Sequence, residues 1–364
     1  MEQTTVCITT INRPTFLVDL INNAKKNNFF DYNIVLIGDY KSPKDNPEYI
    51  KKLVSKFKVD INYLTVNDQK KILKKHKLLN SILPYNWGGR KMLANFLSIK
   101  NKSKITIQLD DDNFILKNDF FGSHSIVGKK IRMPLYGNKD RWYNVYESLN
   151  VKENLKIYPR GFFQKYRFKK TKSLKKNEFI KVAACNGLVL NDPDIDAFTR
   201  LYWPISVKSV KKKYLPNFAL RPHTWCTWNN QNTSTYDEVT KIYFTPASVG
   251  RNSDIWTSLV ICKISSHLKE TVAFGNPVVR QDRNLHDLHK DIIDESSCNL
   301  HNENFINLLR QIKLKKNNYF ECMNELIDKS REILKYSKND KFKKFTLRYF
   351  FEYKIWLEEL DNII

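Results

Sequence analysis

The chain of 364 residues is long enough for one large domain or two smaller ones, and its hydrophobic content of 41% is typical of a globular protein rather than a disordered one. It carries 62 Lys and Arg against 38 Asp and Glu, a net charge of +24, and no apolar run reaches the roughly 18 residues that a transmembrane helix needs. The six cysteines form no CxxC pair and the N-terminus lacks the basic and apolar regions of a signal peptide, so we expect a cytoplasmic protein with reduced thiols and neither a disulfide framework nor a zinc site.

The first 115 residues alternate strand and helix patterns. Runs of β-branched and apolar residues predict buried strands, and apolar residues at helical spacing predict helices between them. The expected strands cover 5–11, 33–38, 61–65 and 105–109, and the expected helices cover 16–24, 49–57 and 90–99. Successive β-α-β units predict an α/β fold built on a mostly parallel, doubly wound sheet.

The rest of the chain changes character twice. Residues 116–295 combine many aromatic residues with short strands, expected at 179–190 and 241–245. From about 296 onward, apolar residues recur at helical spacing in three segments. We therefore expect a body formed by 1–295 and a helical C-terminal subdomain at 296–364.

Polar residues follow three of the predicted strands at the point where each strand ends. They are Thr9, Thr10, Asn12 and Arg13 after the first strand, Gly38 and Asp39 after the second, and Asp110, Asp111 and Asp112 after the fourth. Ligands of doubly wound sheets bind beyond the carboxyl ends of the strands. The three groups are therefore expected at one edge of the sheet.

The run Asp110-Asp111-Asp112 admits several interpretations, because adjacent carboxylates repel one another unless a cation lies among them. An EF-hand is excluded, since Ile115 and Phe121 occupy the positions at which that loop needs Gly and Glu. A glycosidase carboxylate pair stays open, as does a solvated acidic turn beside lysines. We favour a strand-end site at which alternate carboxylates bind Mn²⁺ or Mg²⁺ together with a nucleotide diphosphate, because an apolar strand that ends in DDDN is unusual.

Most of the positively charged residues are lysines. A general coding bias toward lysine explains this composition as well as selection for a binding surface does. The lysine runs are spread along the chain, and the sequence has no aromatic-and-basic RNA signature or zinc-finger spacing. We therefore expect no nucleic-acid partner. The charge is compatible with an anionic partner, including peripheral contact with a membrane surface.

A series of longer motifs carries a resemblance to known families. They are GDYKSP at 38–43, YLTVNDQ at 63–69, LPYNWGGRKMLANFLSI at 83–99, ITIQLDDDNF at 105–114, YPRGF at 158–162, RNSDIW at 251–256, QDRNLHDLHKDIIDE at 281–295 and WLEEL at 356–360. In this order, and over nearly the whole chain, they resemble the STELLO-type glycosyltransferase-like proteins. More distantly, the DDD run, the Arg160-Gly161 pair and GLVLNDPDIDA at 187–197 are similar to the reversibly glycosylated polypeptides, the UDP-arabinopyranose mutases.

Both resemblances imply a GT-A-like nucleotide-sugar-binding fold with a mixed central sheet. Residues 1–115 would form the nucleotide-binding half and 116–295 the acceptor half of one catalytic domain. The residues expected to contact the nucleotide are Thr9, Thr10, Asn12, Arg13, Gly38, Asp39, Arg90 and Asp110, with Arg90 facing the diphosphate.

The same resemblances assign the metal ligands and the catalytic residues. Asp110 and Asp112 would bind Mn²⁺ or Mg²⁺ with His286 as a third ligand. Asp111 would point toward the sugar, or toward the residues that surround and orient the metal ligands. Asp254 would be the base that deprotonates the acceptor. Arg160 matches the arginine that becomes glycosylated in the mutases, and would otherwise contact a phosphate or glycan. The tryptophans of the acceptor half, Trp225, Trp228 and Trp256, would stack on sugar rings or belong to the core.

Together these features predict a metal-dependent glycosyltransferase that takes a nucleotide-diphosphate sugar, with UDP as the expected nucleotide, and a glycan or protein-linked acceptor. One alternative is a pyranose–furanose mutase that acts on a UDP-sugar. Another is a non-catalytic scaffold that organises enzymes of glycan synthesis.

Overall fold

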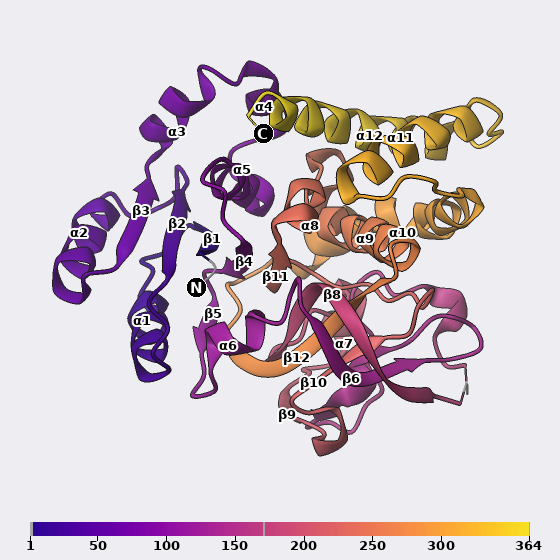
Figure 1. Cartoon of the computed structure of the whole chain (residues 1–364), viewed down its shortest axis with the longest axis horizontal. Coiled ribbons are helices and arrows are strands. Elements are labelled where there is room, and N and C mark those ends of the chain that lie inside the picture. The colour runs from indigo at the N-terminus through magenta and orange to yellow at the C-terminus, as the bar shows by residue number, and fades with distance from the viewer. Residues whose placement is uncertain (1–2, 170–171, 364) are drawn as a thin grey trace.

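Four parallel strands begin the fold in the computed structural model, which describes residues 3–169 and 172–363. They are β1 (Thr4–Thr10), β2 (Tyr32–Gly38), β3 (Asp60–Leu64) and β4 (Ile105–Asp110), and they lie in the order β3-β2-β1-β4 (Figure 1). Each lies within one residue of its predicted bounds. Every residue of β2 is buried, which explains its continuous apolar character, because helices cover both faces of such a sheet.

Helices connect these strands. They are α1 (Phe16–Lys26), α2 (Asn46–Phe57), α3 (Val66–Leu73), α4 (Lys77–Ile82) and α5 (Met92–Lys100), and a short 3₁₀ turn, η1 (Gly88–Lys91), precedes α5. The helix predicted at 90–99 therefore begins as a 3₁₀ turn. Helix α3 was not predicted from the sequence. It starts at a capping box, in which the side chains of Thr65 and Asp68 accept bonds from each other's backbone N–H groups.

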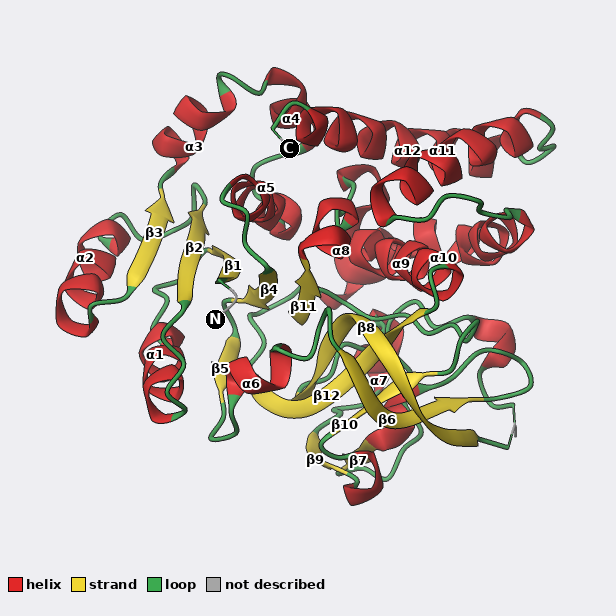
Figure 2. Cartoon of the chain, in the orientation of Figure 1, coloured by secondary structure: helices red, strands yellow, loops and turns green. Residues whose placement is uncertain are grey.

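Beyond β4 the sheet becomes mixed, so the prediction of a mostly parallel sheet holds only for its first four strands (Figure 2). The next strands along the sheet are β11 (Asn232–Tyr236), β8 (Leu174–Asn191), β6 (Lys130–Gly137), β10 (Asn217–Leu220), β12 (Glu270–Gln281) and β5 (Asn113–Ile115), with β7 (Leu149–Val151) and β9 (Val207–Val210) at its margin. The antiparallel pairing of β11 with β4 joins the two halves.

In the second half, the described residues form the further helices α6 (Phe120–His124), α7 (Ala197–Tyr202), α8 (Asp237–Ile242) and α9 (Ser253–His267). The strand predicted at 241–245 is wrong, because α8 covers its first two residues and the remainder is a loop. Asp237 and Glu238 occupy the first turn of α8, where the helix dipole favours negative charge, and the apolar residues that suggested a strand fill the core beside them.

The C-terminal part consists of three helices, α10 (Leu288–Gln311), α11 (Tyr319–Lys335) and α12 (Asp340–Asp361). α10 starts ahead of the predicted position 296, since the Asp287 side chain accepts bonds from the first backbone N–H groups. α12 returns to the N-terminal half, where Glu359 bonds to His76 next to α4 (Figure 1). The prediction of an α/β fold with a mixed central sheet and a helical C-terminal part is confirmed.

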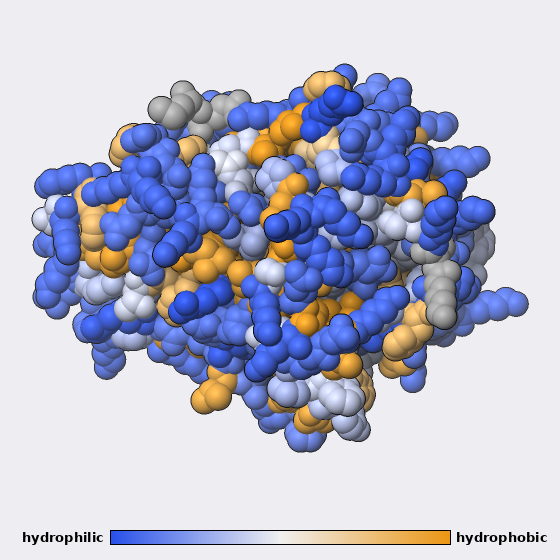
Figure 3. All heavy atoms as spheres, turned by 90° about the horizontal axis from the view of Figure 1, so that it is seen from below, coloured by the Kyte–Doolittle hydropathy of each residue, from blue (hydrophilic) through white to orange (hydrophobic). Residues whose placement is uncertain are grey.

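The surface is strongly hydrophilic. On the face shown in Figure 3, hydrophilic residues dominate and hydrophobic residues form separate patches. Within the described residues, none of the helices combines the length and hydrophobicity needed to cross a bilayer. All six cysteines are buried and free.

Candidate active site

The carboxyl ends of β1, β2 and β4 meet at one edge of the sheet, as predicted. In the parallel register Thr9 pairs with Asp110 on one side, and Thr10 pairs with Gly38 on the other. The Ser42 hydroxyl donates to the backbone oxygen of Thr10 at 2.6 Å and so ties the segment after β2 to the end of β1. The three polar groups of the sequence are therefore neighbours.

Asp111 organises the segment that follows β1. Its Oδ2 accepts bonds from the Thr10 hydroxyl at 2.8 Å, the Ile11 backbone N–H at 3.1 Å and the Asn12 side-chain amide at 3.2 Å. The Asn284 amide reaches its other oxygen at 3.4 Å. These neutral donors hold the carboxylate in place without cancelling its charge.

Asp110 faces a buried lysine. The Lys91 ammonium from η1 forms an ion pair with Asp110 Oδ1 and donates to the backbone oxygen of Asn230 at 3.0 Å. The Lys91 side chain is 1% exposed, whereas that of Asp110 is 36% exposed. Lys91 therefore compensates Asp110 from inside the protein, and the carboxylate remains open to solvent on its other side.

Asp112 is the most buried of the three aspartates. Its Oδ2 accepts from the Gln281 amide at 3.0 Å and the Asn284 backbone N–H at 3.4 Å, while its Oδ1 is buried without a hydrogen-bond partner. Burial and the neighbouring charge of Asp110 raise the pKa of Asp112 to about 6. A buried carboxylate oxygen without a partner is costly unless a cation or water binds it.

The structure does not bring the three expected metal ligands together. Among the described residues, no three His, Cys, Asp or Glu side chains are placed to hold a metal ion together. His286 instead lies 3.1 Å from Asp291 and 3.5 Å from Arg251. An ion at the unpartnered Oδ1 of Asp112 would need phosphate oxygens and water for its other positions, which is how Mg²⁺ is commonly bound in proteins.

Asp39 and Arg13, two of the residues expected to contact the nucleotide, have different environments. Asp39 accepts from the backbone N–H of Asn86 at 2.8 Å and is half-buried at the end of β2. Arg13 is exposed, pairs with Asp45 and lies 5.6 Å above the ring of Tyr49. Arg13 therefore points along the outer side of the segment after β1.

Arg90 is buried and held by neutral groups. Its Nε donates to Gln69 at 2.9 Å, its Nη1 donates to the backbone oxygen of Leu83, and its plane lies 3.5 Å from the ring centre of Tyr85. Its Nη2 is buried without a partner. Burial lowers the pKa of Arg90, an effect that Tyr85 and Asp39 oppose. In this conformation the guanidinium is enclosed, so contact with a diphosphate requires the loop around Tyr85 to move.

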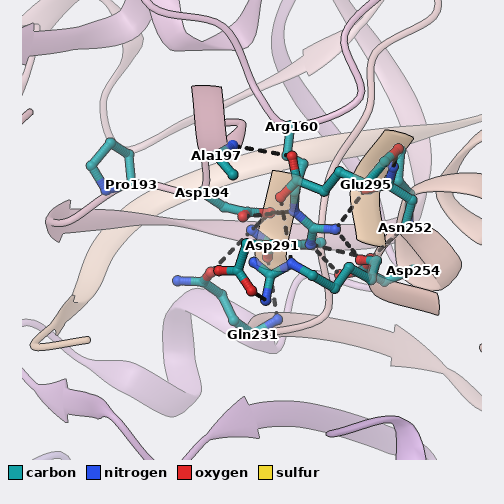
Figure 4. A network of polar contacts seen from close by, with 12 residues as sticks. Arg160, Pro193, Asp194, Ala197, Gln231, Asn252, Asp254, Asp291 and Glu295 are labelled. Carbon is teal, nitrogen blue, oxygen red and sulfur yellow. Dashed lines mark hydrogen bonds and ion pairs between the residues drawn. The ribbon is translucent and has the colours of Figure 1, made fainter. Parts of the chain in front are cut away.

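Arg160 forms the centre of a second charged cluster (Figure 4). Its Nε donates to Asp194 at 2.9 Å, and its Nη2 donates to both oxygens of Asp254 at 3.0 and 3.2 Å. Its Nη1 donates to the Arg251 backbone oxygen and to Asn252. All three nitrogens of the guanidinium therefore donate to acceptors.

The two carboxylates of this cluster differ in their electrostatics. Burial disfavours ionisation of Asp194, but the charge and hydrogen bonds of Arg160 outweigh burial and lower its pKa below the ordinary range. Burial raises the pKa of Asp254, and Arg160 only partly opposes it. One guanidinium cannot fully offset two buried carboxylates, so Asp254 is the one that more readily holds a proton.

A chain of side-chain amides connects the two clusters. The Asn229 amide donates to Asp194 at 3.0 Å and to Gln231 at 3.2 Å, Gln231 donates to Gln281 at 3.3 Å, and Gln281 donates to Asp112. Residues from the turn after β4, the loop before β11, the end of β12 and the loop before α7 thus form one polar wall.

The structure assigns the tryptophans of the acceptor half to the core. Trp228 is 2% exposed and Trp225 is 7% exposed. Trp256 is fully buried, stacks on Phe305 with 3.8 Å between ring centres and donates to Asn302. The proposal that these rings stack on sugars is therefore wrong.

Several residues of the site were not singled out from the sequence. They are Lys91, Asp194, Asn229, Gln231, Gln281 and Asn284. Lys91, Gln281 and Asn284 lie inside the motifs that carried the family resemblance. Asn229 and Gln231 had no signal, because isolated amides are common in loops.

Comparisons with known proteins add remote structural likenesses only. No family model matches the sequence, and neither does any curated protein. The structure is similar to that of S. aureus TarS residues 1–349, with a TM-score of 0.37 and 9% identity, over 99% of this chain and 91% of that chain. It is also similar to the mannosyltransferase PcManGT from Pyrobaculum calidifontis in complex with GDP-Man and Mn²⁺, with a TM-score of 0.38 and 9% identity, over 97% of this chain and 86% of that chain. Likenesses at this level leave the function to be argued from the site.

Proposed function

We propose that this protein is a metal-dependent glycosyltransferase of GT-A type that uses a nucleotide-diphosphate sugar. The observation that carries the proposal is the buried, unpartnered Oδ1 of Asp112 beside Asp110, at the carboxyl ends of parallel strands. Such an edge is where α/β sheets bind ligands, and two carboxylates are the partners that a metal–diphosphate complex takes. The resemblance of the sequence to STELLO-type proteins points to the same class and to uridine as the base.

The residues of the edge would have separate roles. Asp110 and Asp112 would hold Mn²⁺ or Mg²⁺, which would supply positive charge to the departing diphosphate. Asp39 would contact the ribose, and Tyr40, whose exposed ring lies 5.1 Å from that of Tyr85, offers a surface for the base. Asp111 would keep Thr10 and Asn12 in the conformation that lines the nucleotide.

Asp254 is the proposed base for the acceptor hydroxyl. Its raised pKa, and the chain of side-chain amides that connects its cluster to Asp112, support this role. Arg160 would orient Asp254 through its two bonds and would keep the carboxylate available by its charge.

The engagement of Arg160 also bears on the mutase alternative. A covalent glycosyl-arginine intermediate requires a guanidinium nitrogen that is accessible to the sugar, whereas all three nitrogens of the buried Arg160 are engaged by protein acceptors. This favours transfer to an acceptor over ring interconversion. The nucleotide titration described below distinguishes the enzyme from a non-catalytic scaffold.

The proposal is tested by calorimetric titration of UDP, GDP, ADP and CDP with and without Mn²⁺. We expect one nucleotide to bind only with the ion, and we expect Asp112→Asn to lose that binding. Asp328→Asn, at an exposed position of α11, is the matched control and should bind like the wild type. Failure of every nucleotide to bind the wild type, with the protein folded, would contradict the enzymatic proposal and favour a scaffold.

A further inference from the structure

An unusual apolar surface lies on α7 and the residue that follows it. Phe198, Leu201, Tyr202 and Trp203 are 55%, 40%, 72% and 53% exposed. Single exposed apolar residues are normal, but four within six consecutive positions form a contiguous patch of the kind that marks an interaction site. We call these four residues the α7 patch.

An ordinary surface helix buries its apolar side chains and exposes its charged ones, whereas α7 does the reverse. The Arg200 side chain is 10% exposed and that of Asp196 is 9% exposed, so the charged residues of this segment point inward. Arg200 pairs with Asp192, and Asp196 caps the helix by accepting from the Thr199 backbone N–H at 2.8 Å.

The inner side of α7 is fixed to the molecule. The backbone N–H of Ala197 donates to Glu295 of α10 at 3.0 Å, and Arg167 pairs with Asp196 at 2.9 Å. The polar contacts therefore hold the aromatic side chains outward, and the patch is not a consequence of a loosely packed helix. Because buried charges hold this apolar face toward solvent, we expect a binding partner to cover it.

The α7 patch lies beside the candidate active site. Asp192 pairs with Arg283 at 3.0 Å as well as with Arg200, which ties α7 to the loop that contacts Asp112 through Asn284. Leu285, the next residue of that loop, is fully exposed. The patch and Leu285 thus stand on segments that also carry site residues.

We propose that the α7 patch is an interfacial membrane-binding surface that inserts into the headgroup region of an anionic bilayer. Tryptophan, tyrosine, phenylalanine and leucine on one face are the side chains that interfacial helices bury at that depth. The net charge of +24, with exposed Lys152 and Lys208 on the segments around Ser206, supplies the complementary attraction to anionic lipids. A second copy of the chain, which carries the same net charge of +24, would be repelled at this surface. The proposal is independent of the nucleotide site.

The surface is tested with sucrose-loaded vesicles, either of phosphatidylcholine alone or with about one-third phosphatidylglycerol. We expect the wild type to sediment with the anionic vesicles, and we expect a variant with both Tyr202→Ser and Trp203→Ser to bind at least roughly tenfold more weakly. Phe351→Ser, which replaces an equally exposed aromatic residue of α12 (57%), is the matched control and should bind like the wild type. The thermal unfolding temperature of all three proteins should agree.

Fluorescence gives a second readout. Of the seven tryptophans, all within the described residues, only Trp203 is exposed. Anionic vesicles should therefore reduce the quenching of tryptophan emission by acrylamide in the wild type and leave the quenching of Trp203→Ser unchanged.

Three results would overturn the proposal. They are absence of vesicle binding, equal binding by the double variant (which would show attraction by charge alone), and a wild-type dimer in light scattering that the double variant abolishes. Nucleotide titration of the double variant should match the wild type, so a failure here is distinguishable from a failure of the proposed enzymatic function.

Discussion

At the residue scale, the three adjacent aspartates are not equivalent. Asp110 has an internal counter-charge in Lys91, and Asp111 is held by neutral donors from the segment after β1. Only Asp112 keeps a buried oxygen without a partner. The repulsion expected from the sequence is therefore relieved in part by the chain itself, and Asp112 is the carboxylate at which the proposed cation would act.

Lys91 should weaken metal binding. Its charge opposes a divalent ion at the neighbouring carboxylates, so Lys91→Met should tighten Mn²⁺ binding by about tenfold in calorimetry. Lys100→Met, at the exposed end of α5, the helix that follows η1, should leave the affinity unchanged. An unchanged or weaker affinity in Lys91→Met would show that Lys91 only supports the fold of η1.

Arg160 should contribute strongly to stability. Arg160→Met leaves Asp194 and Asp254 buried without their counter-charge, so we expect a loss of about 3–5 kcal/mol in the free energy of unfolding, measured with denaturant. Arg280→Met removes an ion pair with Asp282 in which both side chains are exposed, by 53% and 42%, and should cost less than about 1 kcal/mol. Equal effects of the two substitutions would contradict the central role of Arg160.

At the element scale, the contact between α6 and β11 contains a buried histidine. His124 bonds to Ser234 at 3.1 Å and to Asn232 at 2.9 Å, and both partners lie on the strand that joins the two halves of the sheet. Burial lowers the pKa of His124 to about 4 from a usual value of 6.5. The neutral imidazole is therefore part of this junction.

The junction should weaken in acid. Because the folded-state pKa lies below the unfolded-state value, stability is complete above pH 6.5 and falls as the pH decreases toward 4, by up to about 3 kcal/mol. Unfolding titrations at several pH values should show a smaller loss over this range in His124→Gln than in the wild type. His289→Gln, whose side chain is 81% exposed, should retain the wild-type loss.

At the scale of the whole molecule, the C-terminal helices complete the N-terminal half. Trp356 of α12 is fully buried, stacks on Phe244 with 4.9 Å between ring centres and contacts Phe96 of α5. Its indole N–H donates to the backbone oxygen of Lys241 at 2.8 Å. The C-terminal segment, expected from its sequence to be a subdomain, therefore shares its core with both halves of the sheet.

This shared core predicts cooperative unfolding. Trp356→Ala should lower the free energy of unfolding by about 3–5 kcal/mol, and far-ultraviolet circular dichroism and tryptophan fluorescence should report one coincident transition. Tyr336→Ala, at a position 87% exposed, should change stability by less than about 0.5 kcal/mol. Two separate transitions would indicate an independent C-terminal domain.

The sequence by itself determined the first four strands, the three helical segments at the C-terminus and the meeting of three polar groups at one edge. These features follow from local periodicity and from the rule that parallel strands present their carboxyl ends together. The family resemblance, which rests on the order of the motifs, also pointed to Arg160 and Asp254 as candidate site residues.

Tertiary structure alone decided the partners of those residues. The pairing of Lys91 with Asp110, the position of His286 beside Asp291, and the burial of Trp256 each join positions whose spacing in the chain carries no pattern. The antiparallel insertion of β11 next to β4 and the inward orientation of Arg200 also depend on which segments pack together. Local periodicity records which side of an element is apolar, whereas the charge and burial at a site depend on elements that are distant in sequence.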